Sequence, residues 1–426
     1  MCAADSMPGD LRTHLVTRYS GVRSRTEALA APLSPEDQQL QSMPDCSPTK
    51  WHRAHTTWFF ETFVLLPRKY APVDPAYAYL FNSYYEAVGP RHLRPRRGMI
   101  SRPGVEEVAR YRQIVDGRVL NVLESASEAD LWDLAPLIDL GLAHEEQHQE
   151  LLLTDILNAL SNNPTQPAYQ SAYTSPAATA HGPESPDWVH FEGGVQWVGA
   201  DIGGGFTFDN EGPRHRVWLE PFALASRLVT VGEMKDFIRA GGYANPALWL
   251  SAGMDFVRSH QLTSPYYTTW ADGQLTAFGL TGARVPADDE PISHLSFYEA
   301  DAVCRFLGGR LPTEAEWEVA AAEVRLEGNW ADSGVFHPLP AGRGPGLQQL
   351  FGDVWEWTRS GYEPYPGYVA GPGALGEYNG KFMANQQVLR GGSCFSPRGH
   401  LRVSYRNFWP ADTRFQMTGV RVAKDL

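Results

Sequence analysis

The sequence has few cysteines, no long apolar run and more acidic than basic residues. Its four cysteines, Cys2, Cys46, Cys304 and Cys394, are widely spaced and form no CxxC pair, so neither a disulfide scaffold nor a zinc ribbon is indicated. No apolar stretch approaches the roughly 20 residues that cross a bilayer, and the first residues lack the basic and apolar regions of a signal peptide. We therefore expect a cytoplasmic protein with reduced thiols and no membrane partner.

The excess of acidic residues gives a net charge of −13, which argues against nucleic acid as the main partner. A length of 426 residues is enough for two or three domains with their own cores. Hydrophobic residues make up 43% of the chain and charged residues 20%, as in an ordinary globular protein. Small molecules are therefore the expected partners, and association into a homo-oligomer is left open.

The sequence predicts two domains of different character, and hence an α+β protein. Residues 10–160 carry four helical patterns, which are enough for a four-helix bundle. In the pattern that begins SPTKWHRAH, we expect Ser47 to cap the helix and Pro48 to occupy its first turn. Residues 161–187 are rich in Pro, Ser, Ala and Thr without periodicity, which is typical of a linker. Residues 188–426 combine short β-type runs with two brief helices, TVGEMKDFIRAGG and SFYEADAVCRFLGG.

The longest helical pattern contains the string HEEQH, in which His144 and His148 are four residues apart. Their side chains lie about 40° apart around the helix, on its apolar face. His55 lies on the apolar stripe of another helix and offers a third nitrogen from across the bundle. Three neutral imidazoles leave one face of an octahedral ion open, which suits Fe(II) and O2 better than a closed zinc site. His52, three residues before His55, lies to the side of the stripe and is a reserve candidate ligand.

The same string matches the HExxH signature of zinc peptidases, with Glu145 as the general base. That function requires a third ligand downstream and a substrate groove along a sheet edge. The helix instead continues as LLLTDILNAL towards the linker, and the first half contains no strand pattern. A zinc peptidase is therefore only an alternative function.

Four motifs occur in order in the second half: GGRLPTEAEWEVAA (308–321), GDVWEWTRS (352–360), LRGGSCFS (389–396) and YRNFWPADTRFQMTGVRVA (405–423). Together they resemble the formylglycine-generating-enzyme-like domain, a variant of the C-type lectin fold, over nearly the whole second domain. We expect Trp317, Trp355 and Trp357 to pack its core, and Gly352 and Gly391 to mark tight turns.

In the first half, the strings SPTKWHRAH, NSYYEAVGPRHLRPRRG and HEEQHQE resemble the DinB-like helical bundle. The two domains fused in this order are similar to the iron-dependent sulfoxide synthases of ergothioneine biosynthesis. The resemblance implies a non-haem Fe(II) enzyme that uses O2 to join a cysteine-type thiol, either cysteine or γ-glutamylcysteine, to the imidazole of hercynine. The histidine pattern of that family falls on His55, His144 and His148.

The segment NSYYEAVGPRHLRPRRG supplies further candidates. Tyr84 and Tyr85 carry phenols that can donate a proton or a hydrogen atom while O2 is reduced, unless they only pack the loop. Arg94 and Arg97 can clamp a carboxylate of the sulfur donor, because a guanidinium binds carboxylate through two hydrogen bonds. The alternative for the arginines is a solvated basic loop.

The second domain supplies the remaining candidates. In part of the family a tyrosine of this domain is the donor, and three tyrosines lie in the corresponding region: Tyr365, Tyr368 and Tyr378. For hercynine we expect Gln147 of the bundle to bind the imidazole, Asn407 the carboxylate, and the rings of Phe408 and Trp409 the trimethylammonium group. Each of these residues is also a candidate for simple packing.

Other functions are weighed against the sulfoxide synthase. Formylglycine-generating enzymes use a pair of reactive cysteines just after the RGGS motif, but here Cys394 has no cysteine nearby. We therefore expect Cys394 to be structural. A non-catalytic lectin-like binding module would not need the histidines of the bundle. Another DinB-like metal-dependent thiol enzyme stays as an alternative.

Overall fold

The structure, a computed structural model, describes residues 8–170, 185–201, 205–342, 344–371, 376 and 379–426. The described chain divides into two compact units, the first ending at Asn162 and the second beginning at Asn163. Within the predicted linker at 161–187, residues 171–184 lie outside the described residues.

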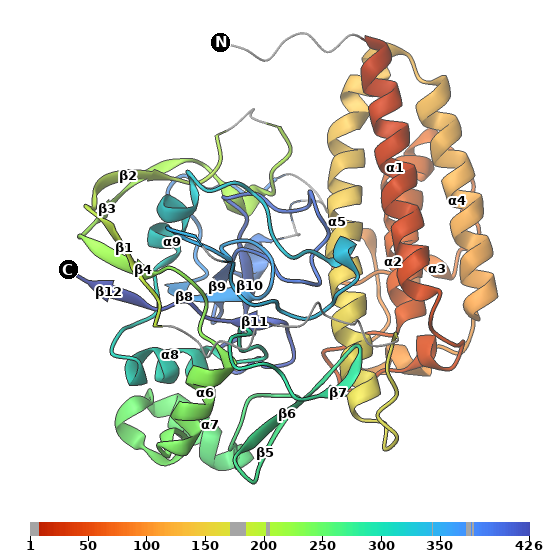
Figure 1. The fold of residues 1–426 in the computed structure, drawn as a ribbon. Helices are drawn as coiled ribbons and strands as arrows, with labels where there is room; N and C mark the ends of the chain where they lie inside the picture. Colours follow the sequence, from red (N-terminus) through yellow and green to blue (C-terminus); the bar gives the residue numbers. More distant parts are fainter. Residues whose placement is uncertain (1–7, 171–184, 202–204, 343, 372–375, 377–378) are drawn as a thin grey trace. The chain divides into compact units, whose positions relative to one another are not determined.

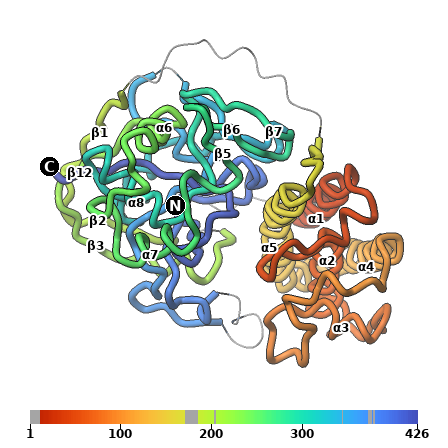
Figure 2. Tube along the Cα trace, turned by 90° about the horizontal axis from the view of Figure 1, so that it is seen from below, coloured from red at the N-terminus to blue at the C-terminus, as the bar shows by residue number. Residues whose placement is uncertain are grey.

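The N-terminal unit is a bundle of four long helices, as the sequence predicted (Figure 1). They are α1 (Pro8–Ala30), α2 (Thr49–Phe60), α4 (Val105–Ser125) and α5 (Glu128–Ser161). The connections contain the short helix α3 (Tyr77–Leu80) and the 3₁₀ turns η1 (Asp37–Gln39), η4 (Glu86–Val88) and η5 (Arg94–Met99). Helix α5 packs against α1 and α2, and α2 also packs against α4; Figure 2 shows the four helices nearly end-on.

The start of helix α2 differs from the prediction. Pro48, not Ser47, is its N-cap residue, and no side chain caps the helix. The backbone N–H of Ser47 instead donates to Asp155 Oδ2 on α5, at 2.7 Å. At its other end α2 continues as the π-helical turn η2 (Glu61–Leu65) and the 3₁₀ turn η3 (Leu66–Arg68). A π turn inside a helix often accompanies a functional site.

Helix α5 carries both histidines of the HEEQH string. It begins after Ser127, whose side chain accepts the N–H of Asp130 and so satisfies one of the donors at the N-terminus. His144 is 1% exposed and its neighbour Glu145 is 0% exposed. Since adjacent helical residues point about 100° apart, burial of both side chains means that α5 is covered on two faces.

The C-terminal unit contains small sheets built from distant segments (Figure 1). One sheet has the order β1–β4–β12 (Trp188–Phe191, Phe222–Ala225, Ala423–Asp425), and another has the order β10–β9–β8–β11 (Asn407–Trp409, Gln387–Arg390, Trp355–Gly361, Thr418–Gly419). The others are β2–β3 (Gly194–Val198, His215–Leu219) and β5–β6–β7 (Thr268–Ala271, Gln274–Gly279, Gly282–Arg284). Strand β11 runs parallel to β8. The sheet-rich second half confirms the predicted α+β class.

This unit also contains four α-helices among its described residues: α6 (Val231–Arg239), α7 (Ser251–His260), α8 (Phe297–Phe306) and α9 (Glu314–Ala321). The sequence predicted only α6 and α8, so the expectation of two helices was wrong. A signal for α9 was present, because Thr313 and Glu316 form a capping box of the kind that also begins α6 and α8. Helix α7 begins without a side-chain cap.

The motif residues of this unit occupy its core, as predicted. Trp317 and Trp357 are 0% exposed, and the indole N–H of Trp357 donates to the carbonyl of Leu295 at 2.8 Å. Gly391 has φ 93°, and a Cβ atom there would lie 2.5 Å from the carbonyl oxygen of Leu350. Only glycine fits that turn.

Asp353 is a buried carboxyl group in the GDVWEW motif. Its Oδ1 accepts the N–H of Leu339 at 2.9 Å and the side-chain amide of Asn329 at 2.9 Å. Burial raises the pKa of Asp353 to about 6. The pKa of Asp353 is therefore higher in the folded protein than in the unfolded protein. As the pH rises from the unfolded-state pKa to the folded-state pKa, the free energy of unfolding falls, and above the folded-state pKa it falls no further on account of this group.

We expect the variant Asp353→Asn to remove this pH dependence, because its amide oxygen still accepts both hydrogen bonds and carries no charge. Relative to the wild type, its free energy of unfolding in urea should rise by about 1 kcal/mol more at about pH 7.5 than at about pH 5. The exposed Asp255 of α7 provides the control variant Asp255→Asn. A difference between Asp353→Asn and wild type that does not change with pH would contradict the prediction.

Candidate metal centre

Three histidine side chains of the bundle gather around one point between α2 and α5. His55 comes from α2, and His144 and His148 come from successive turns of α5. One ring nitrogen from each lies within 4.8 Å of the others, and the Nε2 atoms of His55 and His144 are 3.1 Å apart. Two ligands at right angles on an ion with bonds of about 2.1 Å are separated by about 3 Å. The spacing of this pair therefore fits a shared metal ion.

The hydrogen bonds of His55 leave the right nitrogen for a metal. Its Nδ1 lies 2.6 Å from the carbonyl oxygen of Phe81, and since a carbonyl only accepts, Nδ1 carries the proton. In a neutral ring Nε2 then has the lone pair, and this is the atom that faces His144. Such a hydrogen bond behind a ligand fixes both the tautomer and the ring orientation.

The three rings are held in the neutral form that binds metals. Desolvation, followed by the neighbouring His144, lowers the pKa of His55 well below its usual value. Desolvation lowers the pKa of His144 to about 3. It also lowers the pKa of His148, with further contributions from the other two rings. Protons therefore compete weakly with a metal ion for these nitrogens.

The ring of His55 is also fixed by stacking. Trp51 stacks on it with ring centroids 4.6 Å apart and planes 13° apart, and Trp58 covers the ring at 5.7 Å and 15°. The guanidinium of Arg97 lies 3.4 Å from the centroid of Trp51. Arg97, Trp51, His55 and Trp58 thus form one continuous stack beside the candidate centre.

Glu145, the residue that a zinc peptidase would use as general base, points to another part of the bundle. Its Oε2 accepts from Arg23 of α1 at 2.7 Å, and its Oε1 accepts from Arg112 of α4 at 2.9 Å and from Thr26 at 2.6 Å. Despite full burial, these cations lower the pKa of Glu145 to about 2. A carboxylate held in this way is a poor base, so the geometry opposes the peptidase alternative.

His52, the reserve ligand, does not belong to the three-nitrogen group. Its Nδ1 lies 2.8 Å from Nδ1 of His148, and its Nε2 lies 3.0 Å from Asp155 Oδ2. It therefore lies behind His148 and contacts that ring on one side and a carboxylate on the other.

Tyr84 and Tyr85 lie in an aromatic cluster that adjoins the histidines. Their rings stack at 4.6 Å, and their hydroxyl oxygens are 3.4 Å apart. Tyr85 is buried and packs against Trp58 at 5.7 Å, which in turn covers His55. One indole ring therefore separates Tyr85 from a candidate ligand.

The two arginines of the same segment differ from each other. Arg94 is exposed and donates to the carbonyl of Asp45. Arg97 is 3% exposed and donates to the hydroxyls of Ser47 at 2.9 Å and Ser83 at 3.0 Å, while its Nε has no hydrogen-bond partner. Among the described residues no carboxylate pairs with Arg97. Its burial, and then the nearby Arg94, lower its pKa well below the usual value.

Comparison with known proteins assigns both units. Residues 18–152 match the DinB superfamily, and residues 174–344 and 344–426 match the sulfatase-modifying factor enzyme 1-like domain. A hercynine oxygenase of Mycolicibacterium thermoresistibile is 31% identical over 97% of this chain and 95% of its own length. The chain belongs to the hercynine oxygenase family. The hercynine oxygenase of Mycobacterium tuberculosis is likewise 31% identical, over 98% of this chain and 99% of its own.

The second unit of this hercynine oxygenase family member also resembles a formylglycine-generating enzyme of Streptomyces coelicolor, at 28% identity over 60% of this chain and 96% of the relative. Cys394, in the motif where that function would need a cysteine pair, is buried, and its backbone N–H donates to the carbonyl of Asp353 at 3.0 Å. None of the described helices is both long and apolar enough to cross a membrane.

The remaining candidate residues come from both units of the chain. Gln147 is partly exposed on α5. Asn407, Phe408 and Trp409 form strand β10 and are each partly exposed. Phe408 stacks on Tyr362 with centroids 3.9 Å apart, so one of its faces already has a packing role.

The tyrosines considered as alternative donors are held by acidic partners. The hydroxyl of Tyr365 donates to Glu314 at 3.3 Å, and that of Tyr368 donates to Asp209 at 2.8 Å. Burial raises the pKa of both phenols. Tyr378 lies outside the described residues.

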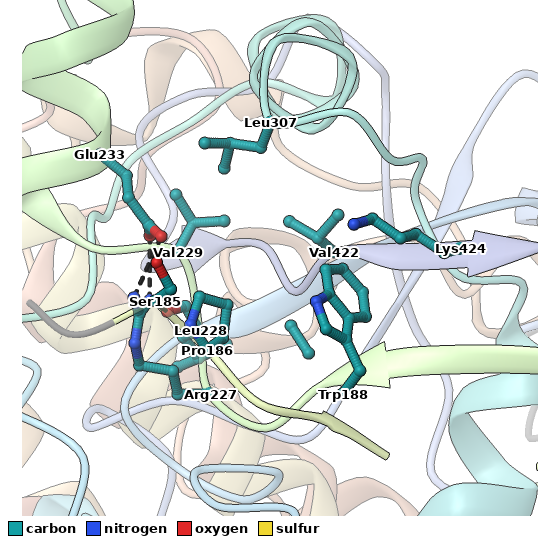
Figure 3. Close-up of a pocket in the computed structure, with 11 residues that line it drawn as sticks. Ser185, Pro186, Trp188, Arg227, Leu228, Val229, Glu233, Leu307, Val422 and Lys424 are labelled. Atoms are coloured by element: carbon teal, nitrogen blue, oxygen red, sulfur yellow. Dashed lines mark hydrogen bonds and ion pairs between the residues drawn. The ribbon is translucent and has the colours of Figure 1, made fainter. Parts of the chain in front are cut away.

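A cavity of about 240 Å³ in the C-terminal unit contains none of these candidates (Figure 3). Its wall carries Trp188, Arg227, Glu233 and Lys424. The charged groups have partners there: Arg227 donates to Glu233 at 2.9 Å, and Lys424 Nζ lies 3.9 Å from the ring centroid of Trp188.

The position of Glu145 predicts that it stabilises the bundle. In Glu145→Gln, Arg23 and Arg112 lose the anion that they share, and the apo protein should lose on the order of 2 to 3 kcal/mol of unfolding free energy in urea. The control is Asp133→Asn, because Asp133 is an exposed carboxylate of the same helix and an exposed charge should contribute less than about 1 kcal/mol. If Glu145→Gln were as stable as the wild type, the carboxylate of Glu145 would not stabilise the bundle and the prediction would be wrong.

Proposed function

We propose that this chain is an Fe(II)-dependent hercynine oxygenase that joins a cysteine-type thiol to the imidazole ring of hercynine and forms a sulfoxide. One observation carries the proposal. Three neutral imidazoles converge in a chain that aligns over nearly its whole length with hercynine oxygenases.

The proposed reaction balances with O2 alone. The thiol loses its S–H hydrogen and the imidazole loses one C–H hydrogen, and a C–S bond forms between them. One oxygen atom goes to sulfur and the other leaves as water with the two hydrogens. His55, His144 and His148 would hold Fe(II), which would supply the redox chemistry for O2 that no side chain can provide.

Arg97 supports an anionic sulfur donor. Asp155 acts on Arg97 only from a distance, and a buried guanidinium with no carboxylate in contact is costly. A carboxylate of the thiol substrate would supply that contact. Ser47 and Ser83 already hold the guanidinium, so its position is set before the substrate binds. Arg94, which lies close enough to affect the pKa of Arg97, adds positive charge and can hold a second carboxylate.

The other substrate, hercynine, carries an imidazole, a carboxylate and a trimethylammonium group. We assign Gln147 to the imidazole and Asn407 to the carboxylate. The exposed faces of Phe408 and Trp409 provide the aromatic surface on which a quaternary ammonium group binds. The hydroxyls of Tyr84 and Tyr85 provide the proton or hydrogen atom that the reduction of O2 requires.

The function is tested by anaerobic reconstitution of the purified chain with Fe(II), hercynine and either cysteine or γ-glutamylcysteine. After O2 is admitted, mass analysis should detect the sulfoxide adduct with one of the two thiols, and this thiol identifies the donor. The single variants His55→Ala, His144→Ala and His148→Ala should each lose turnover, because two imidazoles hold the metal weakly. Hercynine that is not consumed with either thiol would contradict the proposal and leave another DinB-like metal-dependent thiol enzyme as the alternative.

The role of the tyrosines predicts a change of product. In the double variant Tyr84→Phe/Tyr85→Phe, hercynine should bind with nearly unchanged affinity, because neither phenol is proposed as a ligand of the metal or of hercynine. Sulfoxide formation should fall and oxidation of the thiol to its sulfinic acid should rise, as measured by mass analysis. Tyr79→Phe, in the preceding helix α3 and 44% exposed, is the control. Full sulfoxide formation by the double variant would transfer the role to a tyrosine of the second domain: Tyr365, Tyr368 or Tyr378.

A further inference from the structure

Behind His148 lies a short chain of buried polar groups that the proposed reaction does not use. His52 of α2 is 2% exposed, and Asp155, two helical turns after His148 on α5, is 6% exposed. The contacts run from Asp155 Oδ2 to His52 Nε2 at 3.0 Å, and from His52 Nδ1 to His148 Nδ1 at 2.8 Å. Asp155 is itself oriented by the backbone N–H of Ser47, at 2.7 Å.

The position of each proton along this chain follows from what each atom can do. A carboxylate accepts only, so Nε2 of His52 carries a proton and its Nδ1, in the neutral ring, has the lone pair. The facing Nδ1 of His148 must then donate. In neutral His148 the lone pair is consequently on Nε2, the nitrogen left over for a metal.

We propose that His52 and Asp155 are positioning residues that fix His148 in the tautomer that binds the metal and increase its basicity. The inference rests on the metal centre of the proposed function. Outer partners of metal-bound histidines commonly act in this way, and their loss typically lowers metal affinity 10- to 100-fold. The arrangement here has an additional ring, because a histidine stands between the carboxylate and the ligand.

These hydrogen bonds also explain how the carboxylate of Asp155 can be buried. Asp155 sits in the interior without an arginine or lysine in hydrogen-bond contact among the described residues, and a buried carboxylate is unfavourable unless it is well bonded. Its contacts with Ser47 and His52 offset part of that cost. A cation bound by His148 would place a positive charge at the other end of these hydrogen bonds. The rings of His148 and His52 would then connect that charge to the carboxylate of Asp155.

Three substitutions separate this role from simple packing. His52→Leu removes both hydrogen bonds at similar volume. His52→Asn places an amide oxygen near the former Nδ1, where it still accepts from His148. Asp155→Asn keeps an acceptor for His52 and Ser47 but removes the negative charge.

The test measures the dissociation constants of Fe(II), under anaerobic conditions, and of Co(II), by competition with a chelator, together with the Co(II) absorption spectrum. His52→Leu should weaken binding 10- to 100-fold and alter the spectrum, His52→Asn should stay within about fivefold of wild type, and Asp155→Asn should fall between them. The control is Gln149→Leu, since buried Gln149 bonds to Val22 and Thr26 of α1. It should lower the unfolding temperature of the apo protein without changing metal affinity.

Two results would overturn the proposal. One is wild-type affinity in His52→Leu, and the other is equal loss in His52→Leu and His52→Asn with an equal drop in the apo unfolding temperature, which would mark His52 as a packing residue. If wild-type protein itself binds neither metal, the metal centre fails, and with it the proposed function. The affinity of the wild type therefore distinguishes the two failures.

Discussion

The buried carboxylate of Glu145 joins the helices of the bundle, and the placement of the histidines depends on it. Arg23 of α1 and Arg112 of α4 both donate to it, and the same arginines reach α2 through the hydroxyl of Thr57 and the carbonyl of Arg53. This cluster fixes the rotation of α5 about its own axis. Because His144 precedes Glu145 by one residue, that rotation directs the imidazole towards α2.

The buried arginines beside the two faces of α5 differ in whether a carboxylate contacts them. On the Glu145 face, the arginines have further acidic partners in the partly exposed carboxylates of Asp116, which pairs with Arg23, and Glu27, which pairs with Arg112. On the histidine face, Arg97 has no carboxylate in contact among the described residues. One face is thus complete within the protein, whereas the other is suited to receiving charged ligands.

Much of the bundle and the three-histidine group could be predicted from the sequence, because both follow from helical periodicity and from spacing within a helix. His144 and His148 are related by one turn, and His55 lies on an apolar stripe that must face the interior. The contact of His52 with Asp155 could not be predicted, since the two residues are 103 positions apart and meet only through the relative register of α2 and α5. The same reason hid the role of Glu145: the HExxH spacing is identical whether the carboxylate faces the metal or the opposite helices.

The C-terminal unit was less predictable. Its motifs indicated the buried tryptophans and the glycine turns, but strand pairing such as β1 with β4 and β12 joins segments that share no local signal. Helix α7 begins without the capping box that marks the starts of α6 and α8, and α9, at 8 residues, spans little more than two turns.

The hydrogen bond between His55 and the carbonyl of Phe81 limits how this enzyme can vary during evolution. Phe81 precedes Asn82, whose side chain closes the next turn through the backbone of Tyr85 and Gly89. A residue inserted between Phe81 and Gly89 would displace the phenols of Tyr84 and Tyr85 relative to His55 or break the hydrogen bond that sets the tautomer of His55. The length of the stretch from Phe81 to Gly89 is therefore constrained by the tautomer of His55 as well as by the packing of the two tyrosines.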